Sequence, residues 1–294
     1  MLTIQAIGFG VITAALIAIG AMGFTIQFGL TNVLNISYAG AMTVGAFATF
    51  LAEEFHLALA LGVVLAPLAG AAVTLILGRT LFAFYARRGA GLFEMVMVTL
   101  AVNLMLQFGI DAASREQIYR FAFPQGPSLH AGPFTFTVTQ LVLVVVAAGV
   151  FAGLEFLLRR TKLGKALRAM AVEPRLARTC GIPTAKIVNV VWVLSGALAG
   201  LAGLAYVINA LTIDASVGTN FLPLVLAAAI LGKAGSTRGA VLAALALGLV
   251  TEEVGAIGGA AYSTVAGFGI LAIVLLTRPA ALAGQAAGKV EITV

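Results

Sequence analysis

The chain has 294 residues, of which 61% are hydrophobic and only 10% are charged. A soluble domain carries about 25% charged residues, so this composition excludes an ordinary water-soluble protein and indicates a membrane protein. The net charge of +6 lies in loops between apolar runs. This distribution predicts membrane topology and argues against a nucleic-acid partner.

The first 52 residues contain no charged side chain. About 20 apolar residues cross a bilayer, so this run predicts two spans. Polar side chains gather where the two spans meet, and the candidates to line a broken helix beside a translocation path are Gln27, Thr31, Asn32, Asn35 and Ser37. The alternative is that these side chains bond neighbouring helices or lie in a loop.

Further apolar runs long enough to cross a membrane follow at residues 57–78, 92–110, 134–158, 187–211 and 259–276. Asn103 and Gln107 are four residues apart and therefore share one helix face, as a pore-lining pair or a packing pair would. Gly196 and Gly200 have the same spacing, which predicts close helix packing. No ionisable side chain lies near the middle of a long run, which argues against a proton-coupled secondary transporter.

Residues 111–133 form a mixed and turn-rich segment between two apolar runs. By alternation of the predicted spans this segment lies on the outer side of the membrane. Arg115 and Arg120 are candidates to pair with acidic residues of an outer binding protein. A solvated loop without a partner is the alternative, because exposed ion pairs contribute little.

Residues 159–186 carry eight of the 17 lysines and arginines. A basic loop between spans marks the cytoplasmic face. Helix-compatible spacing followed by a glycine predicts a short surface helix within it. The loops with acidic residues and no cation should face outside, namely those at Glu53 and Glu54, at Asp214, and at Glu252 and Glu253. The N-terminus is then outside and the C-terminus is cytoplasmic.

Residues 221–251 contain two apolar halves, 221–231 and 240–251, that are each short for a crossing. They form either two thin spans or a re-entrant hairpin shielded by other helices. The predicted fold is therefore all-α, a polytopic transmembrane helical bundle with seven to nine spans. One membrane domain covers residues 1–279, and residues 280–294 form a flexible cytoplasmic tail.

The chain lacks the sequence patterns of an enzyme. GKAGSTRG at residues 232–239 fails the Walker A pattern, because Lys233 is followed by Ala234 instead of Ser or Thr. The single cysteine and two isolated histidines predict no metal site. We therefore expect a chain without catalytic residues and without a cofactor of its own.

Three segments resemble the H-type permease family of branched-chain amino acid ABC importers. They are TKLGKALRA at 161–169 with Glu173-Pro174, Ala177-Arg178 and Cys180-Gly181-Ile182; LNISY at 34–38 with GAF at 45–47; and LGKAGS at 231–236 with Gly239-Ala240. The chain departs from the family at Tyr38, where many members have His, at Lys233, where Gly is frequent, and near Arg238, where Pro is frequent.

This resemblance implies an importer of the bacterial inner membrane. Its partners are a second homologous permease, two cytosolic ATPases that hold ATP and Mg, and a solute-binding protein. The residues implied in ATPase coupling are Gly164, Arg168, Glu173, Pro174, Arg175, Arg178 and Gly181. The implied substrates are leucine, isoleucine and valine, with amides, urea or aromatic acids as the alternative and a stand-alone secondary transporter as the less favoured class. Whether two identical or two different permeases pair stays open.

Overall fold

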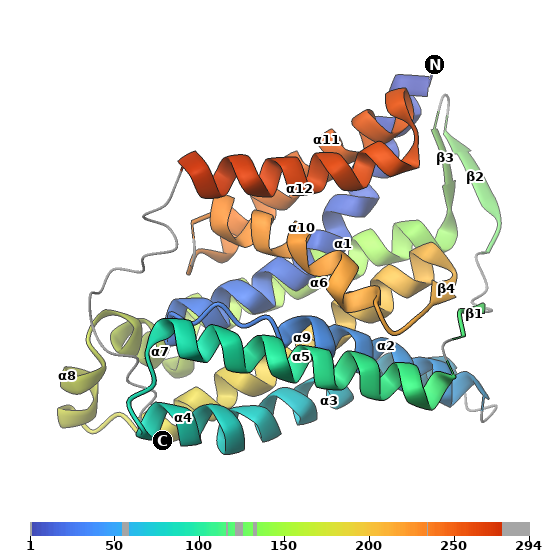
Figure 1. The fold of residues 1–294 in the computed structure, drawn as a ribbon. Helices are drawn as coiled ribbons and strands as arrows, with labels where there is room; N and C mark the ends of the chain where they lie inside the picture. Colours follow the sequence, from blue (N-terminus) through green and yellow to red (C-terminus); the bar gives the residue numbers. More distant parts are fainter. Residues whose placement is uncertain are drawn as a thin grey trace.

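The structure, a computed structural model, describes residues 2–54, 59–115, 117–120, 126–131, 134–233 and 235–277. It is a helical bundle with two small sheets at one end (Figure 1). The helices are α1 (Leu2–Thr31), α2 (Tyr38–Glu54), α3 (Leu59–Leu77), the π-helical η1 (Gly78–Phe82), α4 (Ala83–Arg87), α5 (Leu92–Ser114), α6 (Val138–Arg160), α7 (Lys162–Val172), α8 (Pro174–Thr179), α9 (Thr184–Ala210), α10 (Val217–Leu231), α11 (Thr237–Gly258) and α12 (Ala260–Thr277). The predicted tail at 280–294 lies outside the described residues.

Within the described residues, six helices are long and apolar enough to cross a membrane: α1, α3 with its continuation to Arg87, α5, α6, α9 and α11. Two shorter apolar helices, Tyr38–Ala52 and Val217–Leu231, accompany them. These lengths confirm a polytopic helical membrane protein. The count of seven to nine spans stays a prediction.

Four short strands accompany the helices in the described part of the chain, and the fold stays all-α as expected. β1 (Tyr119–Arg120) pairs antiparallel with β4 (Thr212–Ile213), and β2 (Ser128–Ala131) pairs with β3 (Phe134–Thr137). Phenylalanine and threonine alternate along β3, a sequence pattern typical of a strand with one apolar and one polar face. All four strands lie at the end of the bundle opposite α7 and α8 (Figure 1).

Helices from the first part of the sequence pack against helices from its last part. α1 packs along α11, α9 packs along α3, and α1 and α9 contact each other between them. The short helices α2 and α10 also contact each other. The contacts are therefore symmetric under exchange of α1 with α9, α2 with α10 and α3 with α11.

Glycines of α9 allow this close packing. A Cβ atom at Gly200 would overlap the carbonyl group of Ala66 in α3, and one at Gly203 would overlap the carbonyl group of Met42 in α2. A Cβ at Gly196 would overlap the hydroxyl of Thr74. The glycine spacing read from the sequence therefore reflects helix packing.

Residues 221–251 were predicted to contain two short apolar halves. The first half is short in the structure, but the second belongs to a longer helix. α10 has 15 residues, but α11 has 22 and continues through Glu252 and Glu253. Ser236 starts α11 by accepting a hydrogen bond from the Gly239 N–H at 3.2 Å. The expected loop at Glu252 is wrong because Thr13 of α1 donates to the Glu252 carboxylate at 2.6 Å, which satisfies that charge within the bundle.

Candidate functional site

The chain between α1 and α2 turns back into the bundle. Asn32 ends α1 in the left-handed conformation, with φ of 52°, and its N–H donates to the Phe28 carbonyl at 2.8 Å. At the start of α2, the hydroxyl of Tyr38 donates to the carbonyl of Gly20 at 2.8 Å, far from the end of α1. The helix α2 therefore begins partway along α1, inside the bundle, as Figure 1 shows.

The non-helical backbone between these helices is held by side chains. The Thr99 hydroxyl of α5 accepts from the Ile36 N–H at 3.2 Å and lies 3.3 Å from the Leu34 carbonyl. The Asn35 side-chain oxygen accepts from the N–H and the hydroxyl of Ser37, at 3.1 and 2.6 Å. Irregular backbone at membrane depth requires such partners. Asn35 and Ser37 stabilise this linker, which corresponds to the loop alternative, and their place beside a translocation path stays a prediction.

A line of polar side chains crosses from α5 to α10. Thr99, Asn103 and Gln107 follow one another at four-residue spacing and share a face of α5. The Asn103 amide donates to the Thr219 hydroxyl of α10 at 3.3 Å, and that hydroxyl donates to the Gln107 side-chain oxygen at 2.7 Å. We call these four residues the polar stripe.

The polar stripe contains buried groups without a hydrogen-bond partner. Asn103 is 1% exposed, and its side-chain oxygen has no partner among the described residues. The same is true of the Asn35 side-chain nitrogen and of both amide atoms of Gln27. Leaving such a group unpaired costs about 1–3 kcal/mol, so each of these atoms is a candidate for a contact with water or a polar solute.

Two of the predicted path residues stand apart from the polar stripe. Gln27 is buried in α1, and no hydrogen bond joins it to the polar stripe in the described part of the chain. Asn32 is exposed at the end of α1, where its backbone ends the helix. Thr99 and Thr219 were missed by the sequence analysis, although the four-residue spacing from Asn103 was a signal for Thr99.

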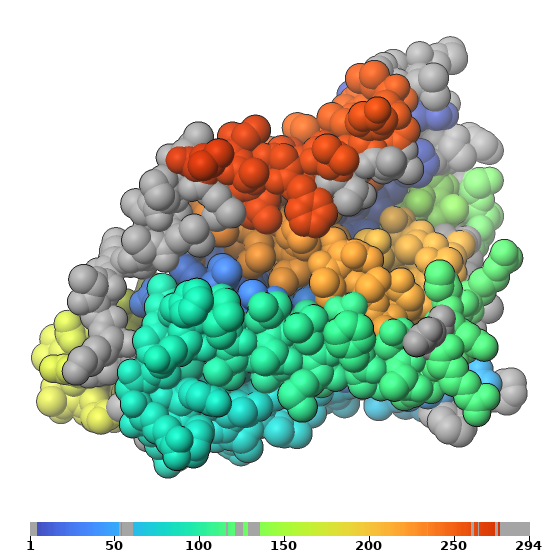
Figure 2. All heavy atoms as spheres, in the orientation of Figure 1, coloured from blue at the N-terminus to red at the C-terminus, as the bar shows by residue number. Residues whose placement is uncertain are grey.

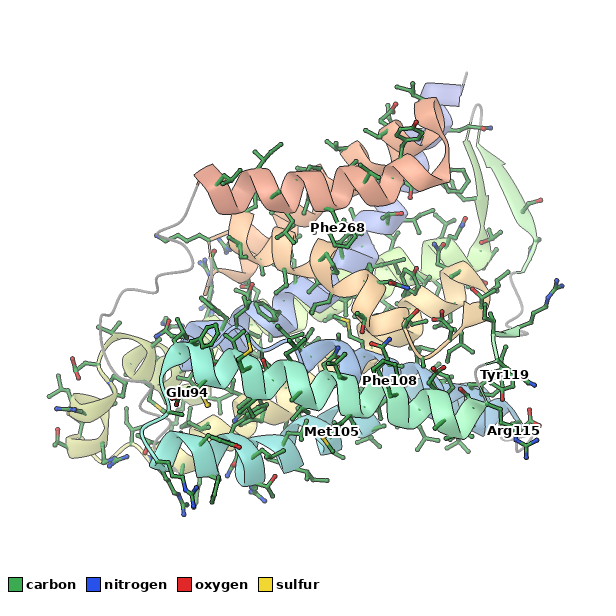
Figure 3. The ribbon with its side chains drawn as sticks, viewed as in Figure 1. Glu94, Met105, Phe108, Arg115, Tyr119 and Phe268 are labelled. Carbon is green, nitrogen blue, oxygen red and sulfur yellow. The ribbon has the colours of Figure 1, made fainter. Side chains whose placement is uncertain are left out.

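The outer face of α5 is apolar and borders a recess. Met105 and Phe108 are 75% and 61% exposed on α5, and Phe268 is 51% exposed on α12 (Figure 3). Figure 2 shows α10 at the floor of the recess between α5 and α12. Asn220 of α10 is exposed and donates to the Ser216 hydroxyl at 2.8 Å. An exposed amide on an apolar membrane helix favours a protein or water neighbour over lipid.

At the basic end, α7 is fastened to the end of α6. Thr161 starts α7 by accepting from the Gly164 N–H at 3.3 Å. Gly164 has no room for a side chain because a Cβ would overlap the Leu158 backbone. Arg168 donates a hydrogen bond to the carbonyl of the same Leu158. Gly164 and Arg168 therefore set the position of α7 relative to α6.

The helix α8 follows immediately and confirms the predicted surface helix with a glycine stop. Glu173 precedes the helix, Pro174 is its first residue, and Gly181 follows its end with φ of 82°. The N–H of Gly181 donates to the Arg178 carbonyl at 3.0 Å. This arrangement gives α8 a defined start and end.

The outer surface of α7 and α8, which we call the docking module, combines charged and apolar side chains. Val172 and Leu176 are 84% and 61% exposed, and Glu173, Arg175 and Arg178 are exposed beside them. The surface of the docking module is therefore charged, with two apolar side chains among the charges.

Arg115 and Arg120 lie at the opposite end of the bundle, as Figure 3 shows for Arg115. Arg115 is exposed at the end of α5 with φ of 55°, and Arg120 is exposed in β1 opposite Thr212. Both guanidinium groups are therefore available to a partner at that end.

Comparisons with known proteins place the chain in a family. The family model described as "Branched-chain amino acid transport system / permease component" matches residues 6–276. The high-affinity branched-chain amino acid transport system permease proteins BraD of Pseudomonas aeruginosa and LivH of Escherichia coli are 28% and 24% identical, and each alignment covers 94% of both chains. The solved structure of PsaBC from Streptococcus pneumoniae in complex with Fab is similar with a TM-score of 0.48 and 14% identity, over 91% of this chain and 90% of that one.

The family match covers most of the chain, including all six long apolar helices and the docking module. The chain therefore belongs to the family of branched-chain amino acid transport system permease components, as a transport subunit and not an enzyme.

Proposed function

We propose that this chain and a second homologous permease enclose the path of branched-chain amino acids in an ABC importer. Two ATPase subunits that bind ATP and Mg drive it, and a solute-binding protein delivers leucine, isoleucine or valine. The permeases BraD and LivH, named for that transport, support the substrate class. The observation that carries the proposal is the polar stripe beside α2 and α10, two apolar helices that are shorter than the six long ones.

The chemistry of the polar stripe suits an amino-acid zwitterion. Amide and hydroxyl groups both donate and accept hydrogen bonds, so Asn103, Gln107 and Thr219 can meet a carboxylate and an ammonium group in turn. The polar stripe carries no formal charge, and a path must bind its solute weakly enough to release it. The unpaired oxygen of Asn103 is the group most available for such a contact.

The docking module is the proposed contact with the ATPases. Its exposed Val172 and Leu176 supply apolar contact area, and Glu173, Arg175 and Arg178 supply charge complementarity. Gly164 and Arg168 join this surface to α6, so movement of the ATPases would be passed to the bundle. No metal or nucleotide contact is assigned to this chain.

The proposed orientation follows from the separation of the two ends. The end with the docking module carries the excess of lysine and arginine and faces the cytoplasm of a bacterium. The end with β1 and β4 then faces the binding protein, which Arg115 and Arg120 contact. The N-terminus is outside, and the C-terminus is cytoplasmic.

Transport by the reconstituted complex tests the proposal. The permease, its partner subunits and the binding protein are placed in proteoliposomes with ATP on the ATPase side. We expect ATP-dependent uptake of labelled leucine, isoleucine and valine. Uptake of amides, urea or aromatic acids in their place would assign the alternative substrates, and uptake without ATP would contradict the importer mechanism.

A further inference from the structure

A cavity of about 280 Å³ lies beneath the docking module, where four parts of the chain meet. It is separate from the polar stripe. Helix α1 contributes Thr25, Gly29 and Leu30 to its lining, and α6 contributes Glu155, Leu158 and Arg159. Helix α7 contributes Leu167, Arg168 and Ala171, and the start of α11 contributes Ser236, Thr237 and Arg238. The close approach of Gly29 and Gly235, where a Cβ on Gly29 would lie 2.9 Å from the Gly235 Cα, closes one wall.

The cavity is rich in positive charge. Three guanidinium groups line it, those of Arg159, Arg168 and Arg238, against the single carboxylate of Glu155. Arg238 directs its Nε to the Glu155 carboxylate at 2.7 Å, and the Arg159 Nε pairs with the same oxygen. Because Glu155 takes the Nε of both arginines, their terminal amino groups remain for a second anion.

Two further parts of the cavity wall carry hydrogen-bond donors that have no partner among the described residues. The first turn of the 22-residue helix α11 begins there. The Ser236 hydroxyl accepts the Gly239 N–H, and the N–H groups of Thr237 and Arg238 stay at the positive end of the helix. The hydroxyl of Thr25 is fully buried and has no partner among the described residues. Thr25 is part of the cavity wall, and the three arginines beside the open N-terminus of α11 favour an anionic ligand.

We propose that this cavity binds a phosphate group, supplied by the headgroup of an acidic phospholipid or by free phosphate. Arginine forks and helix N-termini are the two donors that proteins most often use for phosphate. The cavity lies where the apolar helix α6 ends at Arg159 and Arg160, at the depth of lipid headgroups. A bound phosphate would link α6, α7 and α11 and thereby stiffen the support of the docking module. The site goes beyond the transport role and does not depend on it.

Binding to the full permease complex in detergent tests the site. The probes are short-chain phosphatidylglycerol, short-chain phosphatidylcholine and inorganic phosphate, each titrated while thermal unfolding is followed. We expect phosphatidylglycerol to raise the unfolding temperature, and Arg238→Gln to raise its half-saturating concentration roughly tenfold, the effect of one lost charge-assisted bond. Arg160→Gln is the matched control, because Arg160 is exposed at the same end but does not line the cavity.

The possible results distinguish a specific phosphate site from nonspecific attraction by a basic surface. Equal weakening by Arg160→Gln and Arg238→Gln, or no stabilisation by any probe, would overturn the proposal. Inorganic phosphate that binds with the same dependence on Arg238 would support the site and assign it to a soluble anion. Thr25→Val, which keeps the shape and removes the hydroxyl, should weaken binding less than Arg238→Gln. Failure of amino-acid uptake in proteoliposomes would leave this result unchanged, so the two proposals fail independently.

Discussion

The docking module and the polar stripe solve opposite physical problems in one chain. The docking module is exposed, and its charges are solvated, so an unpaired Arg178 or Glu173 costs little there. Thr99 and Asn103 of the polar stripe are buried among apolar helices, where the unpaired oxygen of Asn103 is expensive. Stability therefore explains neither region fully, because the exposed charges contribute little to it and the unpaired Asn103 oxygen lowers it. Both are better explained by contacts with other molecules.

The buried core around α9 and the outer face of α6 differ in whether they can accommodate an added side chain. The interior around α9 is packed backbone against backbone at Gly200, whereas Gly149 on α6 has open space beside it. We expect Gly200→Val to destabilise the protein by more than about 4 kcal/mol, because the Ala66 carbonyl cannot move away. Expression and monodispersity in detergent should collapse for this variant. Gly149→Val is the control and should behave as the wild type, and an equally stable Gly200→Val would refute the packing account.

Charge reversal in the docking module should abolish function without affecting folding. For Glu173→Arg we expect uptake at background level, because the contact with the ATPases is lost, while membrane insertion and thermal stability stay unchanged. Glu173→Gln, which removes the charge alone, should retain part of the uptake. Wild-type uptake by Glu173→Arg would exclude this residue from coupling.

At Asn103 the expected effects on function and stability differ in size. Asn103→Leu removes an unpaired buried oxygen and also the long 3.3 Å bond to Thr219, so thermal stability should change little. Uptake should fall about tenfold, the effect of one lost hydrogen bond of roughly 1.4 kcal/mol in the transport step. Thermal unfolding and uptake are measured on the same preparation. A variant that loses stability and keeps uptake would show that Asn103 is a packing residue.

Removal of the Thr219 hydroxyl should have a smaller effect. Thr219→Val leaves the Gln107 oxygen without its 2.7 Å donor. Hydrogen bonds between membrane helices contribute about 0.6 kcal/mol on average, so we expect a loss of that size in unfolding free energy. The double variant with Gln107→Leu should recover most of it. Additive losses in the double variant would argue against a direct bond.

The smallest effect is expected at the end opposite the docking module. Reversal of both Arg115 and Arg120 to Glu should raise the binding-protein concentration needed for half-maximal uptake, because charges at the rim of an interface mainly steer association. Maximal uptake should not change. An unaltered concentration dependence would favour solvated arginines without a partner.

The exposed region was the easier one to predict from the sequence. A basic segment in an otherwise apolar chain stands out by composition, and Gly181 marks the end of its helix. Likewise the cluster from Asn32 to Ser37 predicted a break between two helices, and the structure has it there. Composition and local conformation were sufficient in both places.

The buried region was predicted only in part because its partners are distant in sequence. Asn103 and Gln107 were recognisable as a pair on one helix face, but only the fold brings Thr219 between them. Glu252 was taken for a loop residue because two adjacent carboxylates without a nearby cation are typical of an outer loop, and its partner Thr13 precedes it by 239 residues. Threonines are common in membrane helices, so neither partner was distinguishable without the structure.

The central claim is that the docking module holds the ATPases and that the polar stripe serves only the solute. Affinity purification of the tagged chain from its native membrane, as wild type, Glu173→Arg and Asn103→Leu, tests it most directly. The account predicts that two ATPases and a second permease accompany the wild type and Asn103→Leu, and that the ATPases are lost from Glu173→Arg. ATPases that stay with Glu173→Arg, or a wild-type chain purified without them, would contradict it.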